Sequence, residues 1–302
     1  MGSTAKALYI ALMLLMVVLP PESGTRQVKA VPAAGRDIVA QHSFFSAALQ
    51  RQMRYDVVLP AQYLSGQQRY PVIYLGRGWQ GDETNWVKLT RLVELASRYA
   101  LIIVTPQAAN SLYVNPAMNP ADRYTDYIAD DLVTEIDGYY RTIASPLPRA
   151  IAGLSMGGYG ALLLTLRYPD LFSFAASISG AFSGPSGVEH VSPQLILSID
   201  PAFGPPESPT RKENDLDTLI VAADSANTPY MLPDCGTADP LLASNRHVID
   251  ELWSRGIGYE YYGLPGVHTW SFWNNSLLKL FDVLSRKLHL EEPAVNPRDA
   301  VR

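Results

Sequence analysis

Cysteine is nearly absent from this 302-residue chain, and its scarcity excludes two kinds of structural support. Cys235 is the single cysteine, so the chain can form no internal disulfide bond and no zinc site built from cysteine thiolates. A chain of this length with 47% hydrophobic residues can rely on a buried core instead. Cys235 ends a short apolar stretch, and we interpret it as a buried, inert thiol; the alternative is a free reactive thiol.

Runs of like charge are also missing. The net charge is only -5, and the charged residues, 18% of the chain, are spread along it. Proteins that bind nucleic acids usually carry a concentrated basic patch or stripe. The sequence therefore predicts no nucleic-acid partner.

No apolar run reaches the length of about 20 residues that a membrane-spanning helix requires. The stretch from Ala7 to Leu19 is shorter, follows Lys6 and precedes the polar turn sequence PPESG. This arrangement is typical of a secretory signal peptide. We expect residues 1–24 to be a signal peptide or membrane leader that directs secretion or export to the periplasm, and residues 25–42 to be a linker. An uncleaved leader is the one membrane attachment that the sequence indicates.

Short apolar runs alternate with helical patterns through the rest of the chain. Two antiparallel strands are predicted over residues 43–59, and further strands near residues 70–76, 101–106, 149–153, 172–180, 228–234 and 258–264. Helices are predicted over residues 86–100, 124–141, 159–169, 240–255 and 270–287. Such alternation is typical of a mostly parallel sheet covered by helices on both faces. We predict one α/β domain over residues 43–290, with an antiparallel N-terminal hairpin.

Two segments depart from this alternation. Residues 181–215 are crowded with Pro, Gly and Ser around one short apolar piece, LILSI. A long stretch with little regular structure inside a compact domain is usually a lid or a binding insert, and we interpret it as one. Residues 291–302 are predicted to be a frayed tail.

Ser155 stands at a corner where α/β sheets bind ligands. It lies in the sequence GLSMG, directly after the predicted strand 149–153 and before a helix, which is the setting of a nucleophile elbow. Gly153 and Gly157 permit so sharp a turn. The N–H of Met156 would begin the helix and face a developing oxyanion. The alternative is a serine that merely caps the helix.

A serine nucleophile needs a general base, and histidine is the usual one. The chain contains five histidines: His42, His190, His247, His268 and His289. Only His268 follows a predicted strand through a short loop, so it reaches the same sheet edge as Ser155. The alternative for His268 is a solvated loop histidine.

The histidine in turn needs a carboxylate, which in α/β hydrolases comes between serine and histidine in chain order. Asp239 lies in a loop just past the predicted strand 228–234 and fits this order. Asp234 is closer to the strand and less free to reach His268. Asp224 is a further alternative if the preceding run LIVAA is a strand.

A second oxyanion donor is expected in the glycine-rich loop after residue 76. The backbone N–H of Trp79 is our candidate. Tyr113, Trp270 and Trp273 are candidates for the walls of a substrate pocket, together with the Trp79 indole. The alternative for these aromatic residues is an ordinary place in the core.

Five sequence motifs together resemble the esterase D type of α/β hydrolase, and the similarity runs from about Ser43 to Leu288. They are YDVVLPAQY, YPVIYLGRGWQGDETNW, AGLSMGGYGAL, DCGTAD and GVHTWSFW. This family includes S-formylglutathione hydrolases, feruloyl and acetyl xylan esterases and secreted mycolyltransferases. The resemblance implies the α/β-hydrolase fold.

The resemblance also implies roles for residues of the predicted site. Ser155 corresponds to the nucleophile, His268 to the base and Asp239 to the acid, and the N–H groups of Trp79 and Met156 correspond to the oxyanion hole. No metal or organic cofactor is implied.

One position departs from the family pattern. Many relatives have His-Gly where this chain has Arg77-Gly78. We place Arg77 near the mouth of the site, as a candidate for binding a substrate carboxylate or phosphate. The alternative is an arginine that points into solvent.

These observations predict an exported serine carboxylesterase that acts on small or aromatic acyl esters, with carbohydrate-linked esters among the candidate substrates. Acyl transfer to an alcohol or sugar would use the same residues. A non-catalytic binding protein on the same fold is the third hypothesis. Hydrolysis of formylglutathione belongs in the cytoplasm and conflicts with export, so it is an alternative only if residues 1–24 are not a leader. The sequence leaves the oligomeric state open.

Overall fold

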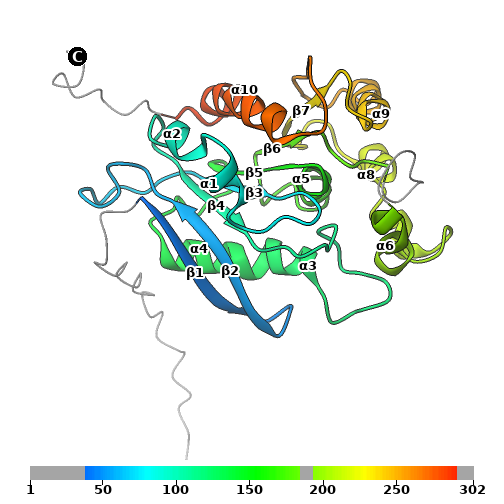
Figure 1. Cartoon of the computed structure of the whole chain (residues 1–302), viewed down its shortest axis with the longest axis horizontal. Coiled ribbons are helices and arrows are strands. Elements are labelled where there is room, and N and C mark those ends of the chain that lie inside the picture. The colour runs from blue at the N-terminus through cyan, green and yellow to red at the C-terminus, as the bar shows by residue number, and fades with distance from the viewer. Residues whose placement is uncertain (1–37, 184–192, 291–302) are drawn as a thin grey trace, which may run out of the picture.

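The computed structural model describes residues 38–183 and 193–290, whose strands form one eight-stranded sheet (Figure 1). The strand order across the sheet is β1-β2-β4-β3-β5-β6-β7-β8. The strands are β1 (Val39–Ser46), β2 (Arg51–Val58), β3 (Val72–Gly76), β4 (Ile102–Pro106), β5 (Arg149–Leu154), β6 (Phe174–Ile178), β7 (Tyr230–Gly236) and β8 (Tyr262–Leu264).

Strand direction follows the prediction. β1 and β2 form an antiparallel hairpin, β2 runs antiparallel to β4, and every pair from β4 to β8 is parallel. The predicted mostly parallel α/β sheet with an antiparallel N-terminal hairpin is confirmed. The hairpin begins at Val39, inside the segment that the sequence indicated as linker. The leader, residues 25–37 of that linker and the tail lie outside the described residues.

Helices cover both faces of the sheet. On one side lie α1 (Asn85–Leu89), α2 (Leu92–Ala96) and α10 (Trp270–Leu288). On the other lie α3 (Tyr124–Asp126), the π-helical segment η1 (Tyr127–Leu132), α4 (Val133–Tyr139), α5 (Met156–Arg167), α6 (Pro193–Phe203), α8 (Leu216–Ala222) and α9 (Leu242–Ser254). A short helix, α7 (Pro209–Glu213), lies between α6 and α8 in the chain. Figure 1 shows α10 and α4 on opposite sides of the sheet.

The two layers arise from alternation within the buried strands. In β3, Val72 and Tyr74 belong to the apolar cluster under α4 and α5, whereas Ile73 and Leu75 belong to the cluster under α10. Successive strand side chains point to opposite faces, so a continuous apolar run serves both layers.

Two predicted helical segments differ in detail. The predicted helix 86–100 is broken at Thr90, whose backbone is extended, because the N–H of Arg91 binds the Asn274 side chain of α10 instead of a helical carbonyl. The described part of 181–215 contains α6 and α7, not the irregular chain expected. Phe203 of α6 packs edge to face on Tyr159 of α5, which gives this segment a place on the core.

No helix within the described ranges combines the length and the apolar character needed to cross a membrane.

Backbone segments approach each other closely where β3, β5 and α5 meet. A Cβ atom at Gly157 would lie 2.5 Å from the carbonyl carbon of Gly76, and one at Gly153 would collide with the Gly157 backbone. Real Cβ atoms do not approach backbone so closely, so glycine is required at both positions. This contact fixes the start of α5 beside the end of β3.

We predict that Gly157→Ala destabilises the protein, although helix propensity alone would favour alanine by about 1 kcal/mol. The backbone clash must displace α5 or β3, and we expect a net loss of about 2 kcal/mol or more in the free energy of unfolding. Urea unfolding measures it. Gly258→Ala is the matched control, because its Cβ would meet only the Tyr230 ring at 3.2 Å. Equal stability of the Gly157→Ala variant and the wild type would contradict the clash.

Candidate active site

Loops at the carboxyl ends of four strands converge on one cavity. Ser155 lies between β5 and α5, Asp239 follows β7, and His268 follows β8. Trp79 lies in the loop from β3 to α1. The parallel strands place all four loops at the same sheet edge.

Ser155 has a strained backbone that its neighbours hold in place. Its φ of 52° and ψ of -116° lie in a region that non-glycine residues rarely occupy. Its N–H donates to the carbonyl of Ile178, and its carbonyl accepts from the N–H groups of Tyr159 and Ala181. Such strain persists only where surrounding structure enforces it, as at functional sites.

Three side chains form a hydrogen-bonded relay. The Oγ of Ser155 lies 3.1 Å from Nε2 of His268, and Nδ1 of His268 lies 3.0 Å from Oδ2 of Asp239. The other carboxylate oxygen of Asp239 accepts the N–H of Leu241 at 2.9 Å. The structure thus brings together the serine, histidine and aspartate that the sequence indicated.

Asp239 is buried, and its environment favours the ionised form. Burial raises the pKa of Asp239, but hydrogen bonds from His268, the Leu241 N–H and Ser179, together with the electrostatic interaction with His268, lower it by more. The net pKa lies below the usual value. Asp239 is therefore an ionised carboxylate at neutral pH, able to hold the imidazole and stabilise its protonated form.

The two alternative aspartates lie elsewhere. The Asp234 side chain is buried beside Ser276 and Lys279 of α10. The run before Asp224 is helix α8 and not a strand, and the Asp224 carboxylate accepts from Ala226 and Asn227. Neither carboxylate is hydrogen-bonded to His268.

His268 is also fixed by aromatic packing. Trp273 meets its ring edge to face, with centroids 4.9 Å apart and an interplanar angle of 87°. Trp270 packs in the same manner on Trp273. The other histidines within the described ranges take no part: His42 stacks on Tyr55, His247 pairs with Asp217, and His289 ends α10.

Two backbone N–H groups beside Ser155 are available to a ligand oxygen. Met156 is the first residue of α5 and has no acceptor inside its helix. Trp79 lies in the β3–α1 loop and lines the cavity with Ser155. Neither N–H donates to another residue in the described ranges. These are the two donors that the sequence indicated.

The cavity has a volume of about 390 Å³. Aromatic and apolar side chains dominate its lining, with Trp79, Trp270 and Trp273 around Ser155 and His268. Leu241 and Pro240 close another part of the wall. Its size falls in the range of small-molecule sites.

Two residues predicted to bind substrate need correction. Arg77 is only 4% exposed and does not line the cavity, so it is neither at the mouth nor in solvent. Its guanidinium donates to the carbonyls of Gly78 and Ala109, and burial lowers its pKa. Tyr113 is 2% exposed, and its hydroxyl accepts the Arg77 N–H at 2.8 Å. Both side chains are buried beside the cavity and not in it. Backbone carbonyls accept the Arg77 guanidinium, and Gly76 and Gly160 leave room for the Tyr113 ring.

The cavity also contains residues that the sequence did not single out: Gln80, Asn85, Ala181, Pro240 and Leu241. All five lie close in sequence to Trp79, the start of the 181–215 segment, or Asp239. Their closeness in sequence to these motifs was the one signal that could have identified them. That closeness does not show which side chains face the cavity.

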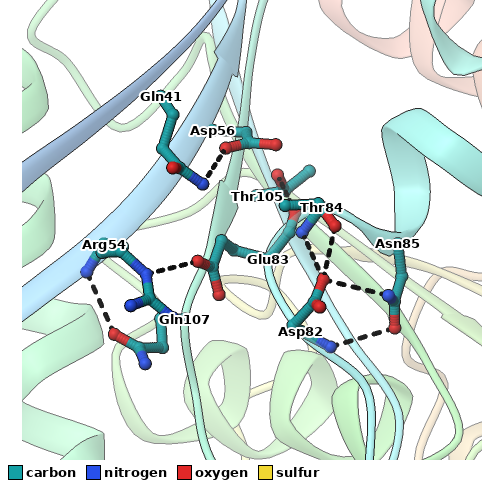
Figure 2. Close-up of polar contacts among 9 residues, drawn as sticks. All are labelled: Gln41, Arg54, Asp56, Asp82, Glu83, Thr84, Asn85, Thr105 and Gln107. Atoms are coloured by element: carbon teal, nitrogen blue, oxygen red, sulfur yellow. Dashed lines mark hydrogen bonds and ion pairs between the residues drawn. The ribbon is translucent and has the colours of Figure 1, made fainter.

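A polar network holds Asn85 and the loop before it (Figure 2). The Asp82 carboxylate accepts from the N–H and hydroxyl of Thr84 and from the Asn85 amide, which in turn accepts the Asp82 N–H. These contacts lower the pKa of Asp82, chiefly through the Thr84 hydroxyl. The β3–α1 loop is thereby closed on itself at the cavity edge.

The same loop is tied to the sheet through Glu83. The buried Glu83 carboxylate accepts a hydrogen bond from Arg54 of β2 at 2.6 Å. The backbone carbonyl of Glu83 accepts a hydrogen bond from the Thr105 hydroxyl of β4 (Figure 2). Asp56 is buried nearby and its pKa is raised, mainly by burial.

In the part of the chain that the structure describes, no group of three or more histidine, cysteine or acidic side chains could hold a metal ion.

A serine at a strained strand-to-helix corner, followed along the chain by an acid and a histidine at the same edge of a mostly parallel sheet, defines an α/β hydrolase. The sequence model of the Esterase family, described as "Putative esterase", matches residues 46–282. The chain belongs to this family and is a carboxylic ester hydrolase.

Individual relatives agree with this assignment. The chain is 26% identical over 267 residues to the acetyl esterase of Caldicellulosiruptor saccharolyticus, covering 82% of this chain and 98% of that protein. It is 25% identical over 256 residues to the diacylglycerol acyltransferase/mycolyltransferase Ag85B of Mycobacterium leprae, covering 72% and 76%. A solved ferulic acid esterase is similar in structure with a TM-score of 0.70 and 26% identity, covering 83% and 98%. The predicted resemblance to the esterase D type is confirmed.

We predict that Asp234 makes stability depend on pH. Burial raises the pKa of Asp234 to about 6, so its charged form is disfavoured in the folded state. The stability that it contributes is present at low pH and is lost as pH rises toward and through the folded pKa. Asparagine does not ionise, so the Asp234→Asn variant should not lose this stability as pH rises.

The stability of Asp234→Asn relative to wild type should therefore increase between pH 4 and pH 8, by up to about 3 kcal/mol. Urea unfolding at the two pH values measures it. Asp250→Asn, on the exposed face of α9, is the control for removal of a carboxylate. A difference between Asp234→Asn and wild type that stays constant with pH would contradict the prediction.

Proposed function

We propose that this protein is a serine esterase that hydrolyses uncharged esters of small or aromatic acids through an acyl-enzyme on Ser155. The observation that carries the proposal is the relay from Ser155 through His268 to Asp239, at 3.1 and 3.0 Å, beside two free backbone N–H groups. A nucleophile, a base with its orienting acid and an oxyanion site are the parts that acyl transfer from an ester requires.

In the first half-reaction, Oγ of Ser155 attacks the ester carbonyl carbon while Nε2 of His268 accepts the hydroxyl proton. The carbonyl oxygen becomes an oxyanion, which accepts hydrogen bonds from the N–H groups of Trp79 and Met156. The C–O bond to the alcohol then breaks, and His268 gives its proton to the departing alcohol.

In the second half-reaction, water takes the place of the alcohol. His268 removes a proton from water as it attacks the acyl carbon, the oxyanion forms again in the same site, and the proton returns to Ser155 as the acid leaves. Asp239 stays ionised throughout and stabilises the imidazolium.

The cavity lining supports the proposed substrate class. Its described walls carry no lysine, arginine, aspartate or glutamate, so nothing there compensates a charged ester group. The indoles of Trp79, Trp270 and Trp273 offer flat apolar surfaces to a small or aromatic acyl group. The names of the acetyl esterase and ferulic acid esterase relatives agree with such acids, and carbohydrate-linked esters remain candidates for the alcohol side.

Acyl transfer to an alcohol or sugar is a second candidate, favoured by the similarity to a mycolyltransferase. It would use the same relay, with the acceptor hydroxyl in place of water. A non-catalytic binding protein fits less well, because binding alone needs no strained serine hydrogen-bonded to a paired histidine.

We also propose that the enzyme is exported and acts either in the periplasm or outside the cell. Support comes from the sequence of residues 1–24, with Lys6 before the apolar run that ends at Leu19. This segment lies outside the described residues. To test the proposal, the protein is recovered from the cytoplasm, the periplasm and the medium of an expressing bacterium, and its N-terminus is sequenced. Protein found in the cytoplasm alone, with Met1 intact, would contradict export.

We predict that Ser155→Ala abolishes hydrolysis of p-nitrophenyl acetate and methyl hydroxycinnamates. Loss of the nucleophile should reduce kcat by at least about 10⁴-fold. Ser173→Ala is the control, because Ser173 precedes β6 at the opposite sheet edge. It should keep wild-type activity.

Added alcohols or sugars in the same assay separate the two reactions. Acid as the main product supports hydrolysis, whereas an ester of the acceptor as the main product supports acyl transfer. Wild-type rates equal to those of Ser155→Ala on every ester would reject both enzymatic proposals.

A further inference from the structure

Arg77 is a buried cation next to the active-site wall that forms no ion pair within the described ranges, although Asp82 and Glu83 lie near enough to interact with its charge. Its Nη1 donates to the carbonyl of Gly78 at 2.8 Å, and its Nη2 donates to the carbonyl of Ala109. Its Nε is buried without a partner, and no carboxylate within the described ranges forms an ion pair with it. Placing a full charge in such surroundings is costly, so the position calls for an explanation.

The carbonyl of Gly78 and the N–H of Trp79 belong to the same peptide unit. In a planar trans peptide the C=O and N–H bonds point in opposite directions. The Arg77 guanidinium donates to the Gly78 carbonyl oxygen at 2.8 Å, and the Gly81 N–H donates to the same oxygen at 3.4 Å. The shorter, charged contact therefore helps to fix the direction of the Trp79 N–H. Gly78 and Trp79 both line the cavity that contains Ser155, and the Trp79 N–H donates to no other residue within the described ranges. In the proposed mechanism this N–H donates to the oxyanion.

The charge of Arg77 adds to this geometry. A hydrogen bond from a cation to a carbonyl is stronger than a neutral one, and hydrogen bonds in a chain polarise each other in a low-dielectric interior. Arginine stays protonated in proteins. The Trp79 N–H is thus made a better donor, and the buried positive charge lies behind the site where negative charge develops.

We infer that Arg77 is a positioning residue for the oxyanion site, acting through the Gly78–Trp79 peptide. The inference rests on the proposed function, because it requires an oxyanion beside Ser155. It gives Arg77 a role in the reaction that does not involve contact with the substrate.

A neighbouring loop keeps the guanidinium in place. Ala109, Leu112 and Tyr113 have positive φ values of 42°, 54° and 58°, which cost energy for residues with side chains. The second arm of Arg77 binds the carbonyl of Ala109, and the Tyr113 hydroxyl accepts the Arg77 N–H. Arginine spans both loops because its planar fork offers donors in two directions.

The test compares Arg77→Met and Arg77→Lys in the full-length chain, with wild type and Ser155→Ala as the limits. Steady-state kinetics on p-nitrophenyl acetate give kcat and KM. Inhibition by an aryl boronic acid, which forms a tetrahedral adduct on serine, reports the oxyanion site without turnover. We expect Arg77→Met to lower kcat at least about tenfold, less than the loss of a whole oxyanion donor, with KM within about twofold of wild type.

Arg77→Lys should keep an intermediate kcat, because it retains the charge but not the fork. Boronate affinity should fall in the same order as kcat. A role in folding alone would change the amount of active enzyme and the thermal stability, but it would not weaken the boronate relative to the substrate.

Arg141→Met is the matched control. Arg141 also donates its guanidinium to backbone carbonyls, those of Tyr63 and Gln68, but at the far end of β3. The Arg141→Met variant should be less stable than wild type, but its kcat per folded molecule should be unchanged. If Arg77→Met does not fold, Arg77→Gln replaces it as the neutral variant and should fall below Arg77→Lys in kcat.

Each outcome decides between the proposals. If wild type is active and folded Arg77 variants match it in kcat and boronate affinity, or if Arg141→Met loses kcat equally, the role of Arg77 is rejected and the esterase stands. If wild type is no more active than Ser155→Ala, the proposed function fails and this inference fails with it.

Discussion

The whole site depends on one steric constraint, the contact of backbone with backbone where β3, β5 and α5 meet. Only glycine at 153 and 157 lets α5 start so close to the end of β3. That closeness places Ser155, the N–H of Met156 and the β3–α1 loop around one small volume. The strained φ of Ser155 follows from it, because the chain must reverse from strand to helix without room for a wider turn. Close backbone contact, and not any single strong bond, therefore positions Ser155.

The loop that carries Trp79 has no regular structure of its own, and three sets of contacts supply its rigidity. Asp82 closes the loop on Thr84 and Asn85, Glu83 ties it to β2 and β4, and Arg77 holds one of its peptide groups from behind. Donors that stabilise an oxyanion are effective when they need no reorganisation during the reaction. A loop fixed at three points meets that condition better than a free one.

The sequence predicted the parallel sheet and the order of Ser155, Asp239 and His268 because both follow from local patterns. Buried strands have continuous apolar runs, and residues just past their carboxyl ends must share an edge. Arg77 and Tyr113 were misplaced because sequence position gives no direction for a side chain. An arginine beside a glycine-rich loop is expected to face water, and only the three-dimensional arrangement shows carbonyls of two separate loops converging on it. The break at Thr90 likewise depends on Asn274, a residue far away in sequence.

The absence of charged side chains from the described cavity wall has a consequence for the surroundings in which the enzyme can work. A charged cleft attracts oppositely charged substrates at long range, and dissolved ions screen this attraction. The association rate with such a cleft therefore falls as salt concentration rises. A wall of indole, leucine and proline attracts its substrate by removing apolar surface from water, which ordinary salts alter little. We therefore expect capture of an uncharged ester by the described part of this cavity to depend on shape and apolar area, and to proceed at similar rates in dilute and in saline medium.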